Sequence, residues 1–340
     1  MTQNLSSSGV PGILRPPRPD DFVSFAPDFG TRFILTVDTE EEFDWAKPLD
    51  RTSHGLAHVP RLGKFQQFCE GMGVVPIYLV DFPIANDPNA AEILAEAVAA
   101  RKAEIGVQLH PWVSPPFTEE LNVHNSFAGN LPAELERAKF RKLRETVERA
   151  FGAGPLIYRA GRYGVGPNTA AILSEAAIAI DTSVRPHFDY SATGGPDFTG
   201  FPLRPWWIDK RNGLMEMPLT TVFAGSLRKW GQALYPLLWR VPRMRGALAR
   251  LGLLERIPLT PEGITLDEAR RGIDIALDLG LPVLTFSFHS PSLRPGHTPY
   301  VHSEDDLDRF YDWWRGVFEH LAESGVRPAS VAEVIAAAQV

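Results

Sequence analysis

The segment FILTVDTEEEFD, residues 33–44, runs from an apolar stretch directly into a cluster of acids, and this pattern decides the fold. Its first five residues are apolar or β-branched, as in a strand buried inside a sheet. Crowded carboxylates repel one another unless solvent, a cation or a metal ion offsets the repulsion. If the strand ends near Asp38, alternation directs Asp38 and Glu40 to the same side, so we expect both in a functional site. We interpret Glu41, Glu42 and Asp44 as a charged loop.

The same succession of apolar and polar residues recurs along the chain. We expect strands at residues 33–37, 75–80, 104–109, 156–158, 177–181, 214–217 and 283–288. Between and after them, helical periodicity predicts helices at 59–71, 90–101, 132–151, 168–176, 265–279, 304–324 and 330–338. Strands that alternate with helices favour an α/β fold with a mainly parallel sheet, open or closed into a barrel. Catalytic groups in such folds lie at the carboxyl ends of the strands.

Four other strand ends carry chemically useful side chains: His110, Arg159, Asp181 and His289. Imidazole and carboxylate side chains together suit zinc, so the acids near Asp38 favour His110 as a metal ligand. Arg159 cannot lose its proton and could hold a carboxylate ionised. His289 can act as a general acid if a neighbouring carboxylate keeps it protonated.

Composition limits the classes of protein that this chain can represent. With 340 residues and a net charge of −7, it has no overall attraction to nucleic acid. A single cysteine, Cys69, excludes an internal disulfide framework, and its apolar helical surroundings favour a packing role. We expect a flexible Pro/Ser-rich leader over residues 1–30, one domain over 31–340 and, in the absence of a signal sequence or a transmembrane segment, a cytoplasmic location.

The order of the strand-end motifs resembles the polysaccharide deacetylases, also called the NodB-homology or carbohydrate esterase family four proteins. The resemblance runs from about Phe33 to His289 and implies a distorted, incomplete (β/α) barrel of about seven strands. It also implies removal of N- or O-acetyl groups from carbohydrates with a divalent metal, zinc by preference. We therefore expect a carbohydrate substrate, an acetylated amino sugar of a cell-surface polysaccharide or its precursor.

The resemblance assigns roles motif by motif. Thr36-Val37-Asp38-Thr39-Glu40 is similar to the first motif, in which the first acid is the base and the second binds metal. His110 is similar to the metal histidine of the second motif, and Tyr158-Arg159-Ala160 to the third, whose arginine holds the base. Asp181-Thr182-Ser183 is similar to the fourth motif, and His289 to the catalytic acid of the fifth.

Two departures from the family pattern concern the metal and the groove. The second motif is usually His-x-x-x-His, but the fourth residue after His110 is Ser114. His124, eight residues before Pro132, is expected to replace the missing ligand, which makes 111–123 an insertion. Gly161 stands where relatives commonly have proline, so the binding groove is expected to differ.

Two other functions remain open beside a metal-dependent deacetylase. One is a metal-independent hydrolase of C–N bonds, similar to allantoinase-like members of the superfamily; the other is a carbohydrate-binding relative without activity. For substrate contacts we expect Trp112, Tyr163 and Arg162, while Trp206 and Trp207 are further candidates for stacking on sugar rings.

An insertion over about residues 222–260 interrupts the alternation of strands and helices. Its part at 225–256 is rich in tryptophan and leucine and carries seven basic residues against one acid, Glu255. The basic residues are Arg228, Lys229, Arg240, Arg243, Arg245, Arg250 and Arg256. Three interpretations remain: helices packed on the barrel, a lid over the groove, or a cationic element that lies over an anionic substrate or contacts an anionic membrane at its inner face.

Overall fold

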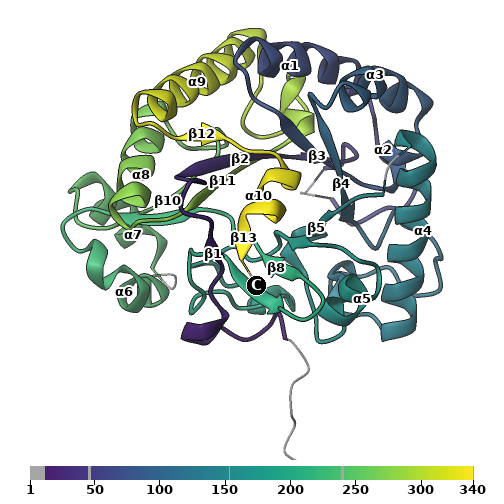
Figure 1. Cartoon of the computed structure of the whole chain (residues 1–340), viewed down its shortest axis with the longest axis horizontal. Helices are drawn as coiled ribbons and strands as arrows, with labels where there is room; N and C mark the ends of the chain where they lie inside the picture. The colour runs from purple at the N-terminus through teal and green to yellow at the C-terminus, as the bar shows by residue number, and fades with distance from the viewer. Residues whose placement is uncertain (1–11, 45–46, 153, 239–240, 340) are drawn as a thin grey trace, which may run out of the picture.

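Seven parallel strands form the centre of the fold in the computed structural model, which describes residues 12–44, 47–152, 154–238 and 241–339 (Figure 1). In spatial order they are β11 (Val283–His289), β2 (Arg32–Thr39), β3 (Pro76–Val80), β4 (Glu104–Leu109), β5 (Ile157–Ala160), β6 (Ile180–Asp181) and β8 (Leu214–Glu216). β7 (Trp206–Asp209) pairs antiparallel with β8 at one edge, and β12 (Arg327–Pro328) pairs with the start of β2. The predicted α/β fold, an incomplete barrel of about seven strands, is confirmed.

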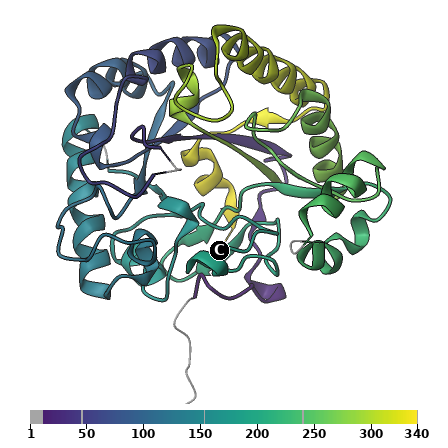
Figure 2. The same ribbon diagram turned by 180° about the vertical axis from the view of Figure 1, so that it is seen from behind.

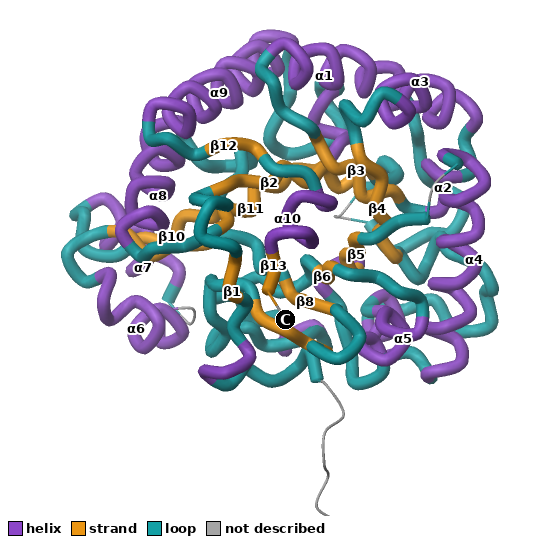
Figure 3. Tube along the Cα trace, viewed as in Figure 1, coloured by secondary structure: helices purple, strands orange, loops and turns teal. Residues whose placement is uncertain are grey.

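Helices surround this curved sheet (Figure 3). The larger ones are α1 (Val59–Gly71), α3 (Pro88–Ala99), α4 (Ala133–Phe151), α8 (Leu266–Asp278) and α9 (Glu304–Glu323), with α2 (Phe82–Ala85) and α5 (Thr169–Glu175) between them. Local sequence fixes several of their starts. Thr265 and Glu268 form a capping box at α8, and Ser303 and Asp306 form another at α9, so the first N–H groups of both helices have acceptors.

Two apolar layers lie on the two faces of the sheet. The outer layer is aromatic where β2 and β11 meet α1 and α9; Phe288, for example, lies 4.9 Å from Phe65 and 5.7 Å from Trp314 between ring centroids. The inner layer fills the barrel and includes Ile77 and Met215. It ends under α10 (Val331–Ala337), which lies in the middle of the ring of strands (Figure 1). Because α10 contacts the start of β4, the opposite, carboxyl ends of the strands remain available for a site.

Gly106 shows how tightly the barrel interior is packed. A Cβ atom there would lie 2.5 Å from Leu79 Cδ2 and 2.6 Å from Ile157 Cγ2. Neighbouring side chains therefore fill the space that a Cβ atom would need, and glycine fits this position of β4.

The barrel is open between β8 and β11. The chain leaving β8 passes the free edge of β11, where Thr220 N–H donates to Thr285 O at 3.2 Å. It then forms an antiparallel pair, β9 (Thr221–Ala224) with β10 (Glu255–Pro258). This pair stands where an eighth parallel strand would close the ring.

The segment before β2 differs from the flexible leader that we expected over residues 1–30. Within its described part, β1 (Ser24–Phe25) pairs with β13 (Ala338–Gln339) at the other end of the chain. Ile13 and Phe29 are buried. Residues 12–30 therefore pack on the domain because they cover apolar surface; residues 1–11 lie outside the described part.

The insertion between β9 and β10 forms two helices at the side of the barrel (Figure 2). They are α6 (Gly231–Leu238) and α7 (Pro242–Arg250), preceded by a 3₁₀ turn, η6 (Arg228–Trp230). Arg240 lies outside the described residues, as does the side chain of Arg243. None of the helices in the described part combines the length and the apolar character needed to cross a bilayer.

Candidate active site

A cavity of about 250 Å³ opens at the carboxyl ends of the parallel strands. Its lining comes from five strand ends and the loops that follow them. The lining residues are Asp38, Glu40, Gln108, His110, Arg159, Ala160, Arg162, Tyr163, Arg185, Tyr190 and His289. Asp38 and Glu40 both face it, as alternation along β2 requires.

Asp38 lies between a permanent cation and an imidazole. Its Oδ1 forms an ion pair with Arg159 Nη1, and its Oδ2 is 3.7 Å from His289 Nε2. Arg159 is fully buried and also donates to Thr182 O at 2.9 Å and to Thr36 Oγ1 at 2.9 Å. The guanidinium is therefore fixed by three groups, and it can hold Asp38 in one orientation.

Glu262, which precedes α8, positions His289 and was not anticipated. Its Oε1 accepts the backbone N–H of His289 at 3.0 Å, and its Oε2 lies 2.7 Å from the ring Nδ1. Burial lowers the pKa of His289, but the carboxylates of Glu262, Glu40 and Asp38 outweigh it and raise the pKa to about 10. The imidazole is thus kept protonated, with Nε2 directed toward Asp38 and the cavity. No local sequence signal distinguishes Glu262 from other loop acids.

Glu40 and His110 face each other across the cavity. Glu40 Oε2 lies 3.4 Å from His110 Nε2 and accepts a hydrogen bond from Gln108 Nε2 at 3.1 Å. Burial raises the pKa of Glu40 to about 8, and the neighbouring acids Glu41 and Asp38 add to the effect. A nearby cation is what such a buried carboxylate needs to stay ionised.

Glu41 is buried behind His110, contrary to the charged loop that we predicted. Its Oε2 lies 2.8 Å from His110 Nδ1, and its Oε1 accepts from Trp112 Nε1 at 2.7 Å. Its backbone N–H donates to Asp81 Oδ2 at 2.8 Å. Burial raises the pKa of both Glu41 and Asp81. Glu41 therefore fixes the ring of His110 and leaves Nε2 to face the cavity.

Glu42 is buried as well and begins a second line of hydrogen bonds. Its Oε1 lies 2.9 Å from His58 Nδ1, and His58 Nε2 lies 2.8 Å from Ser290 Oγ. Ser290 Oγ in turn accepts from the backbone N–H of Glu40 at 3.3 Å. This line ties the end of β2 to the residue after His289. Of the three acids expected in a charged loop, only Asp44 has a largely exposed side chain, which pairs with Lys47.

Two groups of side chains could hold a metal ion. In the described residues, Glu41, Asp81 and His110 have ligand atoms within 4.8 Å of one another, but hydrogen bonds already hold these side chains, and only His110 of the three lines the cavity. Glu40 Oε2 and His110 Nε2 do face the cavity. Two atoms that bind one zinc ion at about 2.0–2.1 Å in a tetrahedron lie about 3.3 Å apart, which their 3.4 Å separation fits.

His124, predicted as the third ligand, is on η2 (His124–Ser126). It is exposed, its Nδ1 lies 3.3 Å from Asn125 Oδ1, and it is not among the residues that line the cavity. The structure therefore brings together two of the three predicted metal ligands.

Asp181 lies behind the cavity rather than in its wall. Its Oδ1 accepts from Ser183 Oγ at 2.6 Å, and that hydroxyl accepts the backbone N–H of Ala160 at 2.8 Å, next to Arg159. Burial raises the pKa of Asp181 and of its buried neighbour Glu216, and the charge of Asp181 adds to the rise at Glu216. Asp181 thus supports the Arg159 segment.

The predicted substrate contacts separate into two groups. Arg162 and Tyr163 line the cavity. Trp112 is buried and stacks on His110 with ring centroids 4.3 Å apart, while Trp206 and Trp207 are buried in β7. The rings of these three tryptophans are buried against other residues, so none of them has an exposed face at this cavity.

Gly161 directly follows β5. A Cβ atom at this position would lie 2.2 Å from His110 Cδ2 and 2.7 Å from Leu109 O. A side chain would therefore displace the imidazole, so glycine here is matched to the position of His110.

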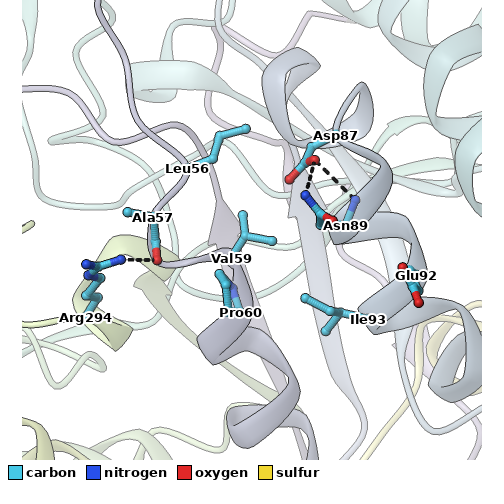
Figure 4. A pocket seen from close by; sticks show the side chains of 9 residues that line it. All are labelled: Leu56, Ala57, Val59, Pro60, Asp87, Asn89, Glu92, Ile93 and Arg294. Carbon is cyan, nitrogen blue, oxygen red and sulfur yellow. Dashed lines mark hydrogen bonds between the residues drawn. The ribbon is translucent and has the colours of Figure 1, made fainter.

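Larger hollows elsewhere lack this set of groups. One of about 680 Å³ lies between the start of α1 and α3 (Figure 4). Around it, Arg294 donates to Ala57 O at 2.6 Å, and Asp87 accepts from Asn89. Its lining includes the acids Asp87 and Glu92 but no histidine, so it lacks the combination of acid and imidazole found in the smaller cavity.

Comparisons with known proteins found similarity to solved structures alone. No known family profile and no curated protein matches the sequence. Among solved structures, one described as a polysaccharide deacetylase from Mycobacterium smegmatis is 20% identical, with a TM-score of 0.46 over 94% of this chain and 98% of that one. The CE4 domain of a xylanase from the hindgut metagenome of Trinervitermes trinervoides is 9% identical (TM-score 0.45; 90% of each chain). A CE4 family pseudoenzyme from Bacillus anthracis is 9% identical (TM-score 0.42; 90% and 66%).

Proposed function

We propose that the chain is a metal-dependent hydrolase that removes an acetyl group, an N-acetyl rather than an O-acetyl, from a carbohydrate. The observation that carries the proposal is the position of Asp38, between Arg159 and a protonated His289, beside the facing pair Glu40 and His110. Base, acid and candidate metal ligands thus border one cavity, and the sequence order of these residues resembles that of the polysaccharide deacetylases.

Asp38 would take the proton from the attacking water. Its ion pair with Arg159 fixes its orientation and leaves its second oxygen toward His289 and the cavity. His289 would give a proton to the departing amine, because Glu262 holds its Nδ1 and leaves Nε2 toward the reacting groups. Amide hydrolysis needs both transfers, since an amine leaves poorly unless it is protonated.

Glu40 and His110 would hold the divalent ion, and Glu41 would orient His110 from behind. When bound, such an ion lowers the pKa of a coordinated water and polarises the substrate carbonyl. A mixed carboxylate and imidazole set suits zinc, with water in the remaining positions.

A metal-independent C–N hydrolase is the second candidate. The observation in its favour is that only two of the predicted ligands face the cavity in the described residues. Acetate release after treatment with a chelator separates the two candidates, because a metal-independent enzyme keeps its turnover.

The proposed function is tested by acetate release from a panel of N- and O-acetylated sugars. We expect turnover of an N-acetylated amino sugar, loss of turnover on chelation and recovery with zinc. Failure of purified, metal-loaded protein to release acetate from any member of the panel would count against the proposal, and binding without turnover would favour a carbohydrate-binding relative.

We further propose that the insertion contacts an anionic membrane. Five of the eleven exposed large apolar side chains of the described residues lie in it: Trp230, Leu237, Val241, Met244 and Leu251. Leu227 N–H donates to Leu253 O at 2.8 Å, which joins the chain just before η6 to the chain just after α7. Exposed apolar groups mixed with cations suit a lipid surface with negative headgroups.

A further inference from the structure

The cavity contains two arginines that the proposed chemistry does not use. Arg162 and Arg185 reach it from the loops after β5 and β6. Arg159, by contrast, is taken up by Asp38, Thr36 and Thr182. Within the part of the chain that the structure describes, no carboxylate lies within 4 Å of either Arg162 or Arg185.

Aromatic rings hold the guanidinium of Arg185 in place. Its Cζ lies 3.9 Å from the ring centroid of Phe188 and 5.2 Å from that of Tyr163. Of its five N–H donors, one has a described partner, the hydroxyl of Tyr190 at 3.2 Å. The guanidinium of Arg185 is therefore fixed in the cavity wall and keeps further N–H donors for a ligand. A preorganised anion site requires both properties.

Arg162 is held at the same wall by a different device. Its backbone adopts the left-handed conformation (φ 56°, ψ 19°), in which arginine is uncommon. Its Cζ lies 4.4 Å from the ring centroid of Phe127, and Nη1 donates to the hydroxyl of Ser126. Its partners are thus neutral, so its charge is left for a ligand.

Two acids of the site already have cationic partners. Asp38 pairs with Arg159 and Glu262 pairs with the protonated His289, while Glu40 belongs to the proposed metal pair with His110. Two partly buried positive charges therefore remain on the Arg162 and Arg185 side. A neutral sugar would cover these cations without compensating them, which is unfavourable.

We propose that the substrate carries an oxyanion, a carboxylate or a phosphate, which binds between Arg162 and Arg185 beside the acetyl group that is removed. Guanidinium groups suit both anions because their planar fork can donate two parallel hydrogen bonds. The inference rests on the proposed function only for the position of the acetyl group, and the anion site itself can be tested by binding.

The test compares three probes by calorimetric titration and by acetate release: N-acetylglucosamine, its 1-phosphate and N-acetylglucosaminuronic acid. We expect the wild-type protein to bind one of the two anionic sugars about 10- to 100-fold more tightly than the neutral one. Which anionic sugar is preferred identifies the anion. Arg185→Gln and Arg162→Gln should reduce this preference, Arg185→Lys should restore part of it, and Arg211→Gln, at an exposed position, should leave it unchanged.

The outcomes separate the anion site from the proposed function. Equal binding of charged and neutral probes by the wild type, or an equal loss in Arg211→Gln, overturns the anion site. Acetate release at equal kcat/KM from all three probes overturns it too, while the deacetylase function stands. A preference that depends on Arg185 without any acetate release supports the anion site and contradicts the deacetylase function. Thermal unfolding of each variant shows whether a loss reflects misfolding.

Discussion

Glu262 holds both the main chain and the ring of His289, accepting the backbone N–H at 3.0 Å and lying 2.7 Å from Nδ1. The two residues are 27 positions apart, yet one carboxylate fixes the orientation of the proposed acid and supports its charge. Without that carboxylate, the partly buried His289 would lose the largest interaction that raises its pKa.

We therefore expect Glu262→Gln to lower kcat about 10- to 100-fold with little change in KM, because proton delivery to the amine fails while binding remains. Steady-state acetate release measures this. In a His289→Gln background, Glu262→Gln should cost almost nothing further, since Glu262 acts through His289. Additive losses in the double variant would contradict this role.

Asp38→Asn should abolish turnover while the fold and most of the bound metal remain, because the amide is nearly isosteric but cannot accept the proton. Arg159→Lys should be nearly as damaging, since one ammonium cannot reach Asp38, Thr36 and Thr182 together. Acetate release beside circular dichroism and metal content checks both variants. Near-normal rates in a folded Asp38→Asn protein would mean that the base lies elsewhere.

Metal content tests the ligand set directly. Glu40→Gln and His110→Ala should lose the ion, Glu41→Gln should bind it about 10- to 100-fold more weakly, and His124→Ala should keep it. Elemental analysis after dialysis against a weak chelator gives the result. A fully loaded His110→Ala would refute the assignment, and an empty His124→Ala would show that this loop histidine reaches the site.

Local patterns predicted the framework well. The bounds of β4 and α1 agree with the expected ranges residue for residue. Both elements have patterns that depend only on residues close in sequence, a run of buried residues in β4 and an amphipathic period in α1. Short elements such as β9 and β10 were missed, since four residues beside a basic insertion show no clear period.

The acids of the site show where such reasoning stops. A run of carboxylates indicates a solvated loop, yet Glu41 and Glu42 are buried because Trp112, His110 and His58 come from elsewhere in the fold to bind them. Partners far apart in sequence decide burial, and neighbouring residues do not identify them. An excess of acids beside a strand end was the one available signal.

Glu136, on α4, predicts a pH-dependent stability. Burial raises its pKa from 4.5 to about 7, although Thr169 donates a hydrogen bond to it. The folded state thus binds this proton more tightly than the unfolded state does. The resulting contribution to the free energy of unfolding is therefore complete below pH 4.5 and is lost as the pH rises through 7. Glu136→Gln should be more stable than wild type at pH 8 by on the order of 2–3 kcal/mol, with little difference at pH 4. Urea unfolding measures this, with exposed Glu145→Gln as the control; an equal difference at both pH values would contradict it.

The insertion offers the last prediction, because its exposed groups allow a matched comparison. Arg228 and Lys229 are exposed beside Trp230, and Lys210 and Arg211 form a similar exposed pair at the turn between β7 and β8. A basic residue near an anionic bilayer contributes about 1 kcal/mol, which fades within a Debye length. Reversing Arg228 and Lys229 to glutamate should therefore weaken binding to phosphatidylglycerol vesicles by tenfold or more at low salt, while reversing Lys210 and Arg211 should change it little. Cosedimentation with phosphatidylglycerol and with phosphatidylcholine vesicles, at low and at high salt, measures this binding and its dependence on lipid charge. Binding that ignores lipid charge, or an equal loss in both pairs, would exclude a membrane surface and leave the insertion as a lid.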